Sequence, residues 1–486
     1  MLTLDEARAA LGSIGQEHVL RFWDGLGGAE RKSLLAQVAS LNLGELPTLI
    51  DQYVKRRPET KLPERVDPAP YYPSNPGEKR SRGPWDSRAA QARGEALLSA
   101  GRVACFTVAG GQGSRLGYEG PKGCYPAGAV TGKSLFQFFA EGILAAKDLY
   151  GTLPPWYVMT SPQNHDATLA FFEQHRYFGL PKDGVTFFPQ GVMASIDMGS
   201  GRMLMVAKHE IATNPDGHGG AIRALVRSGA TADMRKRGVE HISYFQVDNP
   251  IVRVLDPLFL GLHAGASDSS AEMSSKMIPK AYAEEKLGLF CSVGGRTVVI
   301  EYSDLPMERQ RETLPDGTLR FRAGSIAVHT LGVDFVERLE RDPNAQLPFH
   351  RADKKVPCID PESGEPVNPS APNGVKLERF VFDALAMCRA SIVLETSRLE
   401  EFAPIKNAEG VDSPASSAAI QTERAAGWLE AAGVEIPRRD EPGPNGTTRR
   451  VPDCVIELSP RTASSAEDVL RQGLRPKIER GARVAL

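Results

Sequence analysis

A short apolar run that ends in a cluster of glycines constrains the fold of this chain more than any other feature. Val103–Val108 is hydrophobic almost throughout, and Gly110, Gly111 and Gly113 follow it closely. A continuous apolar run of this length, bounded by a turn, is typical of a buried strand. Glycines let a backbone bend tightly and approach another group, and their N–H groups can line an anion-binding hollow. The sequence therefore predicts a buried strand that opens onto a ligand-binding loop.

Two basic residues follow the glycine loop. Arg115 and Lys122 supply positive charge within reach of the same backbone. An arginine can bind phosphate oxygens through two donors, whereas a lysine acts as a point charge. A glycine cluster after a strand is by itself most often a plain turn, but two cations beside it favour a phosphate site. The arrangement suits a triphosphate whose β and γ groups leave as pyrophosphate.

Two familiar phosphate-binding loops do not fit this segment. The P-loop pattern Gly-x-x-x-x-Gly-Lys-Ser/Thr is absent. The spacing of Gly111, Gly113 and Gly117 is one residue too long for the dinucleotide fingerprint. No convincing ribose-binding acid follows about twenty residues later, as that fingerprint requires. A nicotinamide-dependent oxidoreductase is therefore disfavoured.

Strands and helices alternate between about residues 85 and 398. The pattern predicts helices at 134–150 and 167–178, and strands at 156–159 and 244–247. Such alternation implies βαβ units, and therefore an α/β fold with a Rossmann-like, mainly parallel sheet flanked by helices. Gly294-Gly295 separates two further apolar runs, which predicts a hairpin and makes the sheet mixed.

The two ends of the chain differ from this central block. The first fifty-odd residues have helical spacing and begin with a capping box at Thr3 and Glu6. Residues 56–88 are rich in proline and charge, so they cannot hold a helix or a central strand. We interpret residues 1–92 as a helical and proline-rich N-terminal wrap and residues 93–405 as the main domain.

Residues 406–486 are interpreted as a small C-terminal domain. Residues 353–373 and 407–417 are predicted to be loops because they are rich in Pro, Asn and Ser. A helix is predicted at 421–432 and a polar turn segment at 438–445. A last helix is predicted to start at Ser464, with Glu467 as its capping partner.

Composition and charge exclude several classes of function. The chain has 58 basic and 60 acidic residues and a formal net charge of −2, so no bulk charge favours nucleic acid or an anionic membrane. No stretch approaches the ~20 apolar residues of a membrane span. The six cysteines form no Cys-x-x-Cys pair, and no signal peptide is recognisable. We expect a cytoplasmic protein, and any phosphate that it binds must be held by a local site.

The glycine loop and several separate motifs resemble the signature of the eukaryotic-type UDP-sugar pyrophosphorylases. The UDP-N-acetylhexosamine pyrophosphorylases are the most similar branch, over about residues 85–420. The other motifs that carry the resemblance are at 187–191, 215–220, 247–249, 373–383 and 404–407. The resemblance implies a nucleotidyltransferase that joins UTP and a sugar 1-phosphate, most closely N-acetylglucosamine 1-phosphate. The products would be a UDP-sugar and pyrophosphate.

The resemblance also assigns nucleotide-binding and metal-binding residues. Gln190 matches the glutamine that reads the uracil edge in such enzymes, although it would otherwise read as a polar residue at a strand end. Asp248 follows a buried strand and matches the family's Mg²⁺ ligand. Mg²⁺ prefers one or two carboxylates together with substrate phosphates and waters. The nucleotide-binding residues implied by the resemblance are Ala109, Gly110, Gly111, Gly113, Gln190, Gly217 and His218.

Three cations are expected to carry catalysis. Arg115 and Lys122 would hold the pyrophosphate side of UTP, and Lys406 would bring the two anionic substrates together. The sequence contains no convincing Ser/His/Asp or Cys/His set, which fits a direct in-line attack on the α-phosphorus without a protein nucleophile.

Sugar recognition is assigned by the same resemblance. Glu301 is a reasonable acceptor for paired hydroxyl donors. Phe380 and Phe382 match a wall beside the acetamido group, and plain core packing is an equally good interpretation of both. The sugar-binding residues implied by the resemblance are Gly288, Glu301, Tyr302, Ser325, Lys376, Phe380 and Phe382.

Two positions depart from the acetylhexosamine pattern. His218 stands where that branch has asparagine, and a histidine there resembles the UTP–glucose-1-phosphate branch. Ser325 replaces an amide that touches the sugar, and serine has a shorter reach. A glucose-1-phosphate or broad-range enzyme is therefore the alternative. A non-catalytic UDP-sugar binding protein is a third reading, but such a protein would not need Lys122, Asp248 and Lys406 together.

Overall fold

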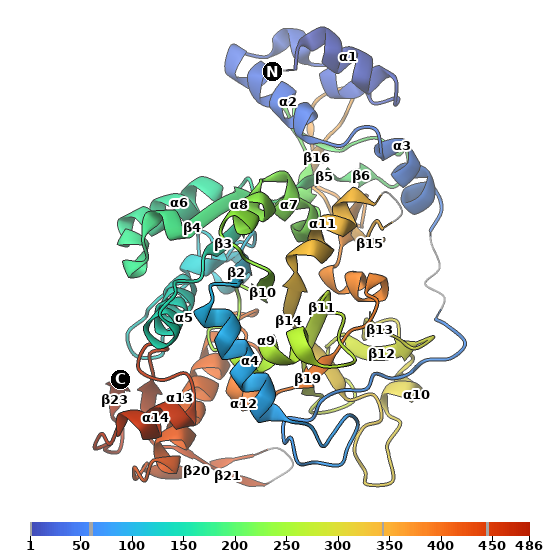
Figure 1. Ribbon diagram of the computed structural model, residues 1–486. Helices are drawn as coiled ribbons and strands as arrows, with labels where there is room; N and C mark the ends of the chain where they lie inside the picture. Colours follow the sequence, from blue (N-terminus) through green and yellow to red (C-terminus); the bar gives the residue numbers. More distant parts are fainter. Residues whose placement is uncertain (1, 58–61, 343–344, 444–446) are drawn as a thin grey trace. The chain divides into compact units, whose positions relative to one another are not determined.

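The computed structural model describes residues 2–57, 62–342, 345–443 and 447–486 (Figure 1). The chain folds as two compact units. The first unit comprises Met1–Leu62, Gln190–Ala224 and Gln346–Asp383, and the second comprises Pro63–Pro189, Leu225–Ala345 and Ala384–Leu486. The domain boundaries expected near residues 92 and 405 stay a prediction.

The second unit is built on a ten-stranded sheet with a parallel core. Four neighbouring strands form this core, in the order β10 (His241–Gln246), β2 (Val103–Val108), β3 (Trp156–Thr160) and β4 (Val185–Pro189). β2 and β3 are buried almost throughout, as their apolar sequences require. The strands expected at 103–108 and 156–159 are confirmed, and β10 begins three residues before the predicted start.

Antiparallel strands extend the sheet beyond β10. β14 (Ala323–Gly332) pairs with β10, and β12 (Leu289–Val293) forms a hairpin with β13 (Arg296–Ile300). Gly294 and Gly295 have φ angles of 56° and 80°, which the predicted two-residue turn requires. The remaining strands of the sheet are β1 (Asp67–Pro68), β11 (Met273–Pro279) and β19 (Val393–Glu395). The expected mixed α/β sheet is confirmed.

Helices flank this sheet. α5 (Leu135–Tyr150) begins at Ser134, whose hydroxyl accepts the N–H of Gln137, and ends at Gly151 with φ 79°. Its apolar face packs against β2 and β3. α4 (Ser87–Ser99) and α9 (Pro257–Gly265) lie side by side (Figure 1). The other helices of the second unit are α6 (His165–Gln174), α8 (Ala230–Lys236), α10 (Met307–Gln310), α11 (Val333–Arg341) and α12 (Arg398–Glu401). The chain passes from the first unit to the second within α7 (Gly220–Arg227).

The C-terminal residues of the second unit have a core of their own, centred on α13 (Pro414–Ala431) and α14 (Ala466–Gln472). α13 begins seven residues before the predicted start, because Ser413 caps it. The cap of α14 is Ser465, which accepts the N–H of Asp468, and not the predicted Ser464. The strands here are β20 (Arg438–Pro442), β21 (Thr448–Pro452), β22 (Val455–Glu457) and β23 (Arg483–Ala485).

One C-terminal prediction is wrong. Residues 438–442 form strand β20, paired with β21, and not a polar turn. Arg438 also forms ion pairs with Glu423 and Glu430 of α13, at 2.9 and 2.8 Å. Backbone pairing and these ion pairs hold a strand that has no apolar alternation. Part of the predicted turn, residues 444–445, lies outside the described residues.

In the first unit, three N-terminal helices pack on short strands from later in the chain. The helices are α1 (Leu4–Gly12), α2 (Gly28–Ser40) and α3 (Leu46–Leu49). The predicted capping box of Thr3 and Glu6 starts α1. The strands are β5 (Val192–Ala194), β6 (Ile196–Asp197), β7 (Met205–Ala207), β8 (Glu210–Ile211), β9 (Thr213–Pro215), β15 (Phe349–Lys354), β16 (Cys358–Ile359), β17 (Pro366–Val367) and β18 (Gly374–Arg379).

One apolar core joins these segments, with Leu11, Leu34, Ile196 and Val375 fully buried or nearly so. Gln16 links the same segments, because its side chain accepts the N–H of Met203 at 2.8 Å. None of the helices that the structure describes is long and apolar enough to cross a membrane.

Candidate active site

The glycine loop leaves β2 and is held by hydrogen bonds from an asparagine that sequence reasoning missed. Asn164 Nδ2 donates to the carbonyl oxygens of Ala109 and Gly111, at 3.0 and 3.2 Å. Asn164 is buried at the N-cap position of α6, although its side chain makes no capping hydrogen bond there. Its place before a helix signals a cap, but nothing in the sequence indicates its bonds to a loop about 55 residues earlier.

Close packing inside the loop explains one of its glycines. The N–H of Gly113 donates to Gly120 O at 2.9 Å. A Cβ at position 113 would lie 2.7 Å from Tyr118 Cδ1 and 2.9 Å from its carbonyl oxygen. Only glycine fits there without a shift of the backbone. The predicted residues Ala109, Gly110, Gly111 and Gly113 thus share one tightly folded loop.

Lys122 and Asp248 meet beside this loop. The N–H of Lys122 donates to Gly111 O at 3.1 Å, and Lys122 Nζ lies 3.7 Å from Asp248 Oδ2. Their side chains are 16% and 15% exposed. Burial lowers the pKa of Lys122, Asp248 raises it, and Lys406 and Arg115 lower it further. The ammonium group of Lys122 therefore lies within electrostatic range of the other three charged residues predicted for catalysis and metal binding.

Asp248 follows β10, and the segment that carries Lys406 is tied to it. The N–H of Ile405 donates to Asp248 O at 2.8 Å. Asn249 Nδ2 donates to the carbonyl oxygen of Glu401 at 2.6 Å, and its Oδ1 accepts the N–H of Ala403 at 3.1 Å. The role of Asn249 in joining these segments was missed, because the bonds span about 150 residues.

Lys406 has its own partners in the following loop. Its N–H donates to Asp412 O at 2.6 Å, and its Nζ lies 3.9 Å from Asp412 Oδ2. The same ammonium group lies 5.3 Å from the centre of the Phe402 ring. Asp412 was not predicted, since it belongs to a loop without pattern. The side chain of Lys406 is 42% exposed, so it remains accessible to an anionic ligand.

Three of the predicted sugar-binding residues come together on the antiparallel strands. The N–H of Ser325, in β14, donates to Gly288 O at 2.8 Å. A Cβ at position 288 would lie 3.2 Å from Glu301 Oε1, so the carboxylate lies directly over this glycine. Tyr302 follows Glu301 and is partly exposed. Gly288, Glu301 and Ser325 thus form one cluster in the second unit.

The remaining predicted residues belong to the first unit. Gly217 has φ 84°, and a Cβ there would lie 2.3 Å from the carbonyl oxygen of Arg379. Gln190 is buried and directly follows β4. Lys376 is half-buried on β18. Asp216, which was not singled out, lies so close to Gly191 and Gly220 that a Cβ at either position would meet its carboxylate.

His218 is enclosed by aromatic rings. It stacks on Phe380 with ring centres 5.1 Å apart, and Phe382 lies 5.7 Å away. His350, which sequence reasoning missed, also stacks on Phe380, with ring centres 4.2 Å apart. Packing thus accounts for both phenylalanines, whether or not they also face a sugar.

The hydrogen bond to His218 fixes its tautomer. The N–H of Val381 donates to His218 Nδ1 at 3.1 Å. Burial, with a contribution from His350, lowers the pKa of His218 to about 4. The ring is therefore neutral at pH 7 and presents Nε2–H as a donor.

We expect the neutral His218 to make stability depend on pH. Its folded pKa is below the ordinary value of 6.5, so between about pH 6.5 and pH 4 the unfolded chain binds more protons. The free energy of unfolding therefore falls as pH falls through this window. His218→Asn should lose less stability than the parent between pH 7 and pH 4.5, measured by urea unfolding. The exposed His175, replaced in the same way, serves as the control; equal losses in all three proteins contradict the expectation.

Comparisons with known proteins agree with one another. Residues 74–419 match the family model described as UTP–glucose-1-phosphate uridylyltransferase. A human protein named UDP-N-acetylhexosamine pyrophosphorylase-like protein 1 is 35% identical, covering 97% of this chain and 96% of its own. The UDP-N-acetylglucosamine pyrophosphorylase of Saccharomyces cerevisiae is 33% identical, over 87% and 90% of the two chains. The solved uridine diphosphate N-acetylglucosamine pyrophosphorylase of Trypanosoma brucei has the same fold, with a TM-score of 0.77, 24% identity and coverage of 97% and 95%.

Proposed function

We propose, from the premise that this chain belongs to the UTP–glucose-1-phosphate uridylyltransferase family, that it joins UTP to N-acetylglucosamine 1-phosphate. The products are UDP-N-acetylglucosamine and pyrophosphate. The choice of an acetylated sugar is supported by the relatives that carry this activity in their names. The observation that carries the chemistry is the Lys122–Asp248 pair, 3.7 Å apart beside the glycine loop.

The residues around Asp248 fit a magnesium ion. The carboxylate follows a strand of the parallel core and remains partly accessible, and Mg²⁺ needs few protein ligands when substrate phosphates and waters complete its shell. Among the described residues, no group of three or more His, Cys, Asp or Glu side chains forms an all-protein metal cage. When bound, Mg²⁺ would neutralise charge on the UTP phosphates.

The protein contributes position and positive charge. The sugar phosphate oxygen attacks the α-phosphorus of UTP in line, and the bond to the β-phosphate oxygen breaks to release pyrophosphate. We assign Arg115 and Lys122 to the leaving pyrophosphate and Lys406 to the space between the two anionic substrates. In support, the positive charges of Lys406 and Arg115 both lower the pKa of Lys122, and bound phosphates would relieve this repulsion.

Recognition of uridine and sugar is assigned by motif and by shape. Gln190, Gly217 and His218 are proposed to contact the uridine, together with the glycine loop. The sugar is assigned to Gly288, Glu301, Tyr302, Ser325, Lys376, Phe380 and Phe382. His218 and Ser325 favour the second candidate, a glucose-1-phosphate or broad-range uridylyltransferase, because both depart from the acetylhexosamine pattern. We place the reaction in the cytoplasm, consistent with six free cysteines in a structure without a disulfide among its described residues.

Pyrophosphate release from UTP with Mg²⁺ and four sugar 1-phosphates tests the proposal. We expect release with N-acetylglucosamine 1-phosphate, and lower rates with the glucose and galactose compounds. Release with glucose or galactose alone would move the chain to the second candidate. UTP binding without release from any of the four, N-acetylgalactosamine 1-phosphate included, would favour a non-catalytic UDP-sugar binding protein.

A further inference from the structure

A cavity of about 810 Å³ lies in the second unit and contains none of the residues proposed for the active site. Its walls come from α4, α5, α13, α14 and the segment at 250–258. Small side chains of α5, among them Gly142, Ala145 and Ala146, form one apolar wall. The volume is within the range of about 300–1,000 Å³ that is typical of small-molecule sites.

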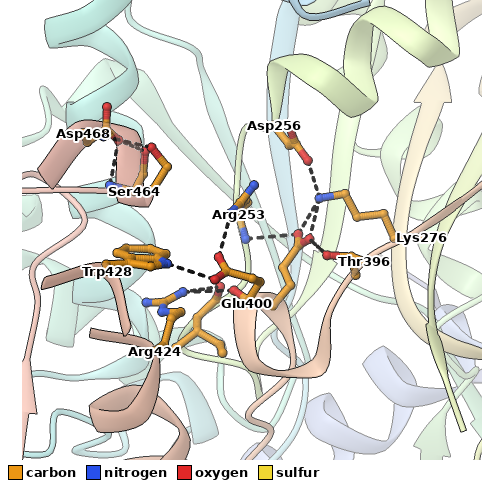
Figure 2. A network of polar contacts seen from close by, with 12 residues as sticks. Arg253, Asp256, Lys276, Thr396, Glu400, Arg424, Trp428, Ser464 and Asp468 are labelled. Atoms are coloured by element: carbon orange, nitrogen blue, oxygen red, sulfur yellow. Dashed lines mark hydrogen bonds and ion pairs between the residues drawn. The ribbon is translucent and has the colours of Figure 1, made fainter. Parts of the chain in front are cut away.

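Charged residues also line the cavity, and some of them belong to a network of polar contacts (Figure 2). The carboxylate of Glu400 accepts a hydrogen bond from Arg253 Nη2 at 2.9 Å and another from Trp428 Nε1 at 2.9 Å. Both of its oxygens are therefore engaged. Arg424 lies next to this carboxylate without sharing it.

Arg424 forms no direct ion pair with the neighbouring carboxylates. Its Nη1 donates to the backbone carbonyl oxygens of Ile251 and Glu400, both at 3.2 Å, and its guanidinium stacks 4.7 Å from the centre of the Trp428 ring. No carboxylate oxygen of the described residues forms an ion pair with it within 4 Å. Burial lowers the pKa of Arg424 to about 10; the charge of Glu400 and, more weakly, that of Glu401 raise it, and the charge of Arg253 lowers it. A buried cation in this situation is stabilised by an anion.

We propose that this cavity binds a small organic anion, with its oxyanion group on the free donors of Arg424 and its apolar body against α5. Arg424 lines the cavity and carries five N–H donors, of which two backbone carbonyls occupy only one nitrogen. A planar guanidinium suits carboxylate, phosphate or sulfonate oxygens. The small residues of α5 leave space for the body of the ligand.

The cavity is connected to the segments that carry Asp248 and Lys406. Ile251 lies three residues after Asp248, and Glu400 lies six residues before Lys406. Arg424 therefore holds both segments through their carbonyl oxygens, close to the bond that Asn249 makes with Glu401 O. An anion that draws the guanidinium into the cavity would weaken the hydrogen bonds of Arg424 to these two segments. The occupied cavity would thus change UTP binding, an effect that rests on the proposed function.

Fluorescence titration with 1-anilinonaphthalene-8-sulfonate, a sulfonate with an apolar body, tests the site in the full-length protein. We expect saturable binding whose Kd rises at least about tenfold in Arg424→Gln, as for loss of one charge-assisted contact. Arg424→Lys keeps the charge and should recover part of the affinity. Arg461→Gln, an exposed arginine that does not line the cavity, should bind like the parent. Equal affinity in all four proteins overturns the proposal.

A second variant separates the cavity from the charge. Ala146→Leu fills the apolar wall and leaves Arg424 in place, so it should also weaken the probe; unchanged affinity would place the probe elsewhere and overturn the proposal. Melting temperatures of all variants, measured without the probe, show whether each is folded.

The coupling is tested by measuring UTP affinity with and without the probe. The probe should change the UTP affinity of the parent and not that of Arg424→Gln. An unchanged UTP affinity overturns the coupling alone. Arg424-dependent probe binding in a protein that releases no pyrophosphate would overturn the proposed function and leave the cavity site standing.

Discussion

Lys122→Ala is expected to lower the turnover of pyrophosphate release by about 10² to 10³, by analogy with the loss of a single oxyanion-hole donor. The ammonium group lies at the glycine loop, 3.7 Å from Asp248. In the proposed mechanism, Lys122 stabilises the negative charge that develops on the leaving pyrophosphate. The fold should survive, because the loop is held by backbone bonds and by Asn164, and the substitution leaves these in place. The measurement is kcat with saturating UTP and sugar 1-phosphate.

Two comparisons isolate this effect from a general loss of structure. Lys182→Ala removes an exposed lysine that pairs with Glu173, and it should leave kcat and the melting temperature unchanged. Lys406→Ala should also reduce turnover sharply, because Lys406 lies in the segment bonded to Asp248. Near-normal turnover of a folded Lys122→Ala would remove this lysine from the mechanism.

The largest effect on stability is expected for Lys276→Met. Lys276 Nζ lies 2.6 Å from Asp256 Oδ2 and 2.6 Å from Glu401 Oε1, and the three side chains are only 1%, 9% and 1% exposed (Figure 2). Methionine leaves two buried carboxylates without their cation. Breaking a buried pair in this way costs about 3–5 kcal/mol of unfolding free energy. Urea unfolding followed by tryptophan fluorescence measures the change.

A double variant shows whether the cost comes from the unpaired charge. Lys276→Met combined with Glu401→Gln removes one of the two carboxylates, and it should recover part of the lost stability. The exposed Lys182→Met is the matched surface control and should unfold like the parent. If the double variant is as unstable as Lys276→Met, packing and not charge accounts for the loss.

The sequence predicts those parts of the fold that depend on residues close together along the chain. The cap at Ser134, the stop at Gly151 and the turn at Gly294-Gly295 each depend on a short stretch of chain, and each is confirmed. Strand β2 is also confirmed, because its own apolar residues predict a buried strand. Local chemistry therefore predicts the parallel core and the loop that it presents.

Features that depend on distant partners could not be predicted. Strand β20 exists because β21 pairs with it, and its own sequence has no strand pattern. Asn164 and Asn249 act through bonds to segments that their surroundings do not indicate. Arg424 would read as an ordinary charged position of a helix. Its bonds to backbone carbonyl oxygens, in place of a direct ion pair, are visible only when α13 and the segments at 251 and 400 are seen together.

The three separate chain segments of the first unit set an order of events during synthesis. α1 and α2 leave the ribosome first, yet the strands that cover their apolar faces, such as those around Ile196 and Val375, come much later. At about 5–20 residues per second, roughly 300 further residues take about 15–60 s to make. During that interval the N-terminal helices carry exposed apolar surface. We therefore expect the yield of folded protein to depend on chaperones that bind the nascent chain during this period.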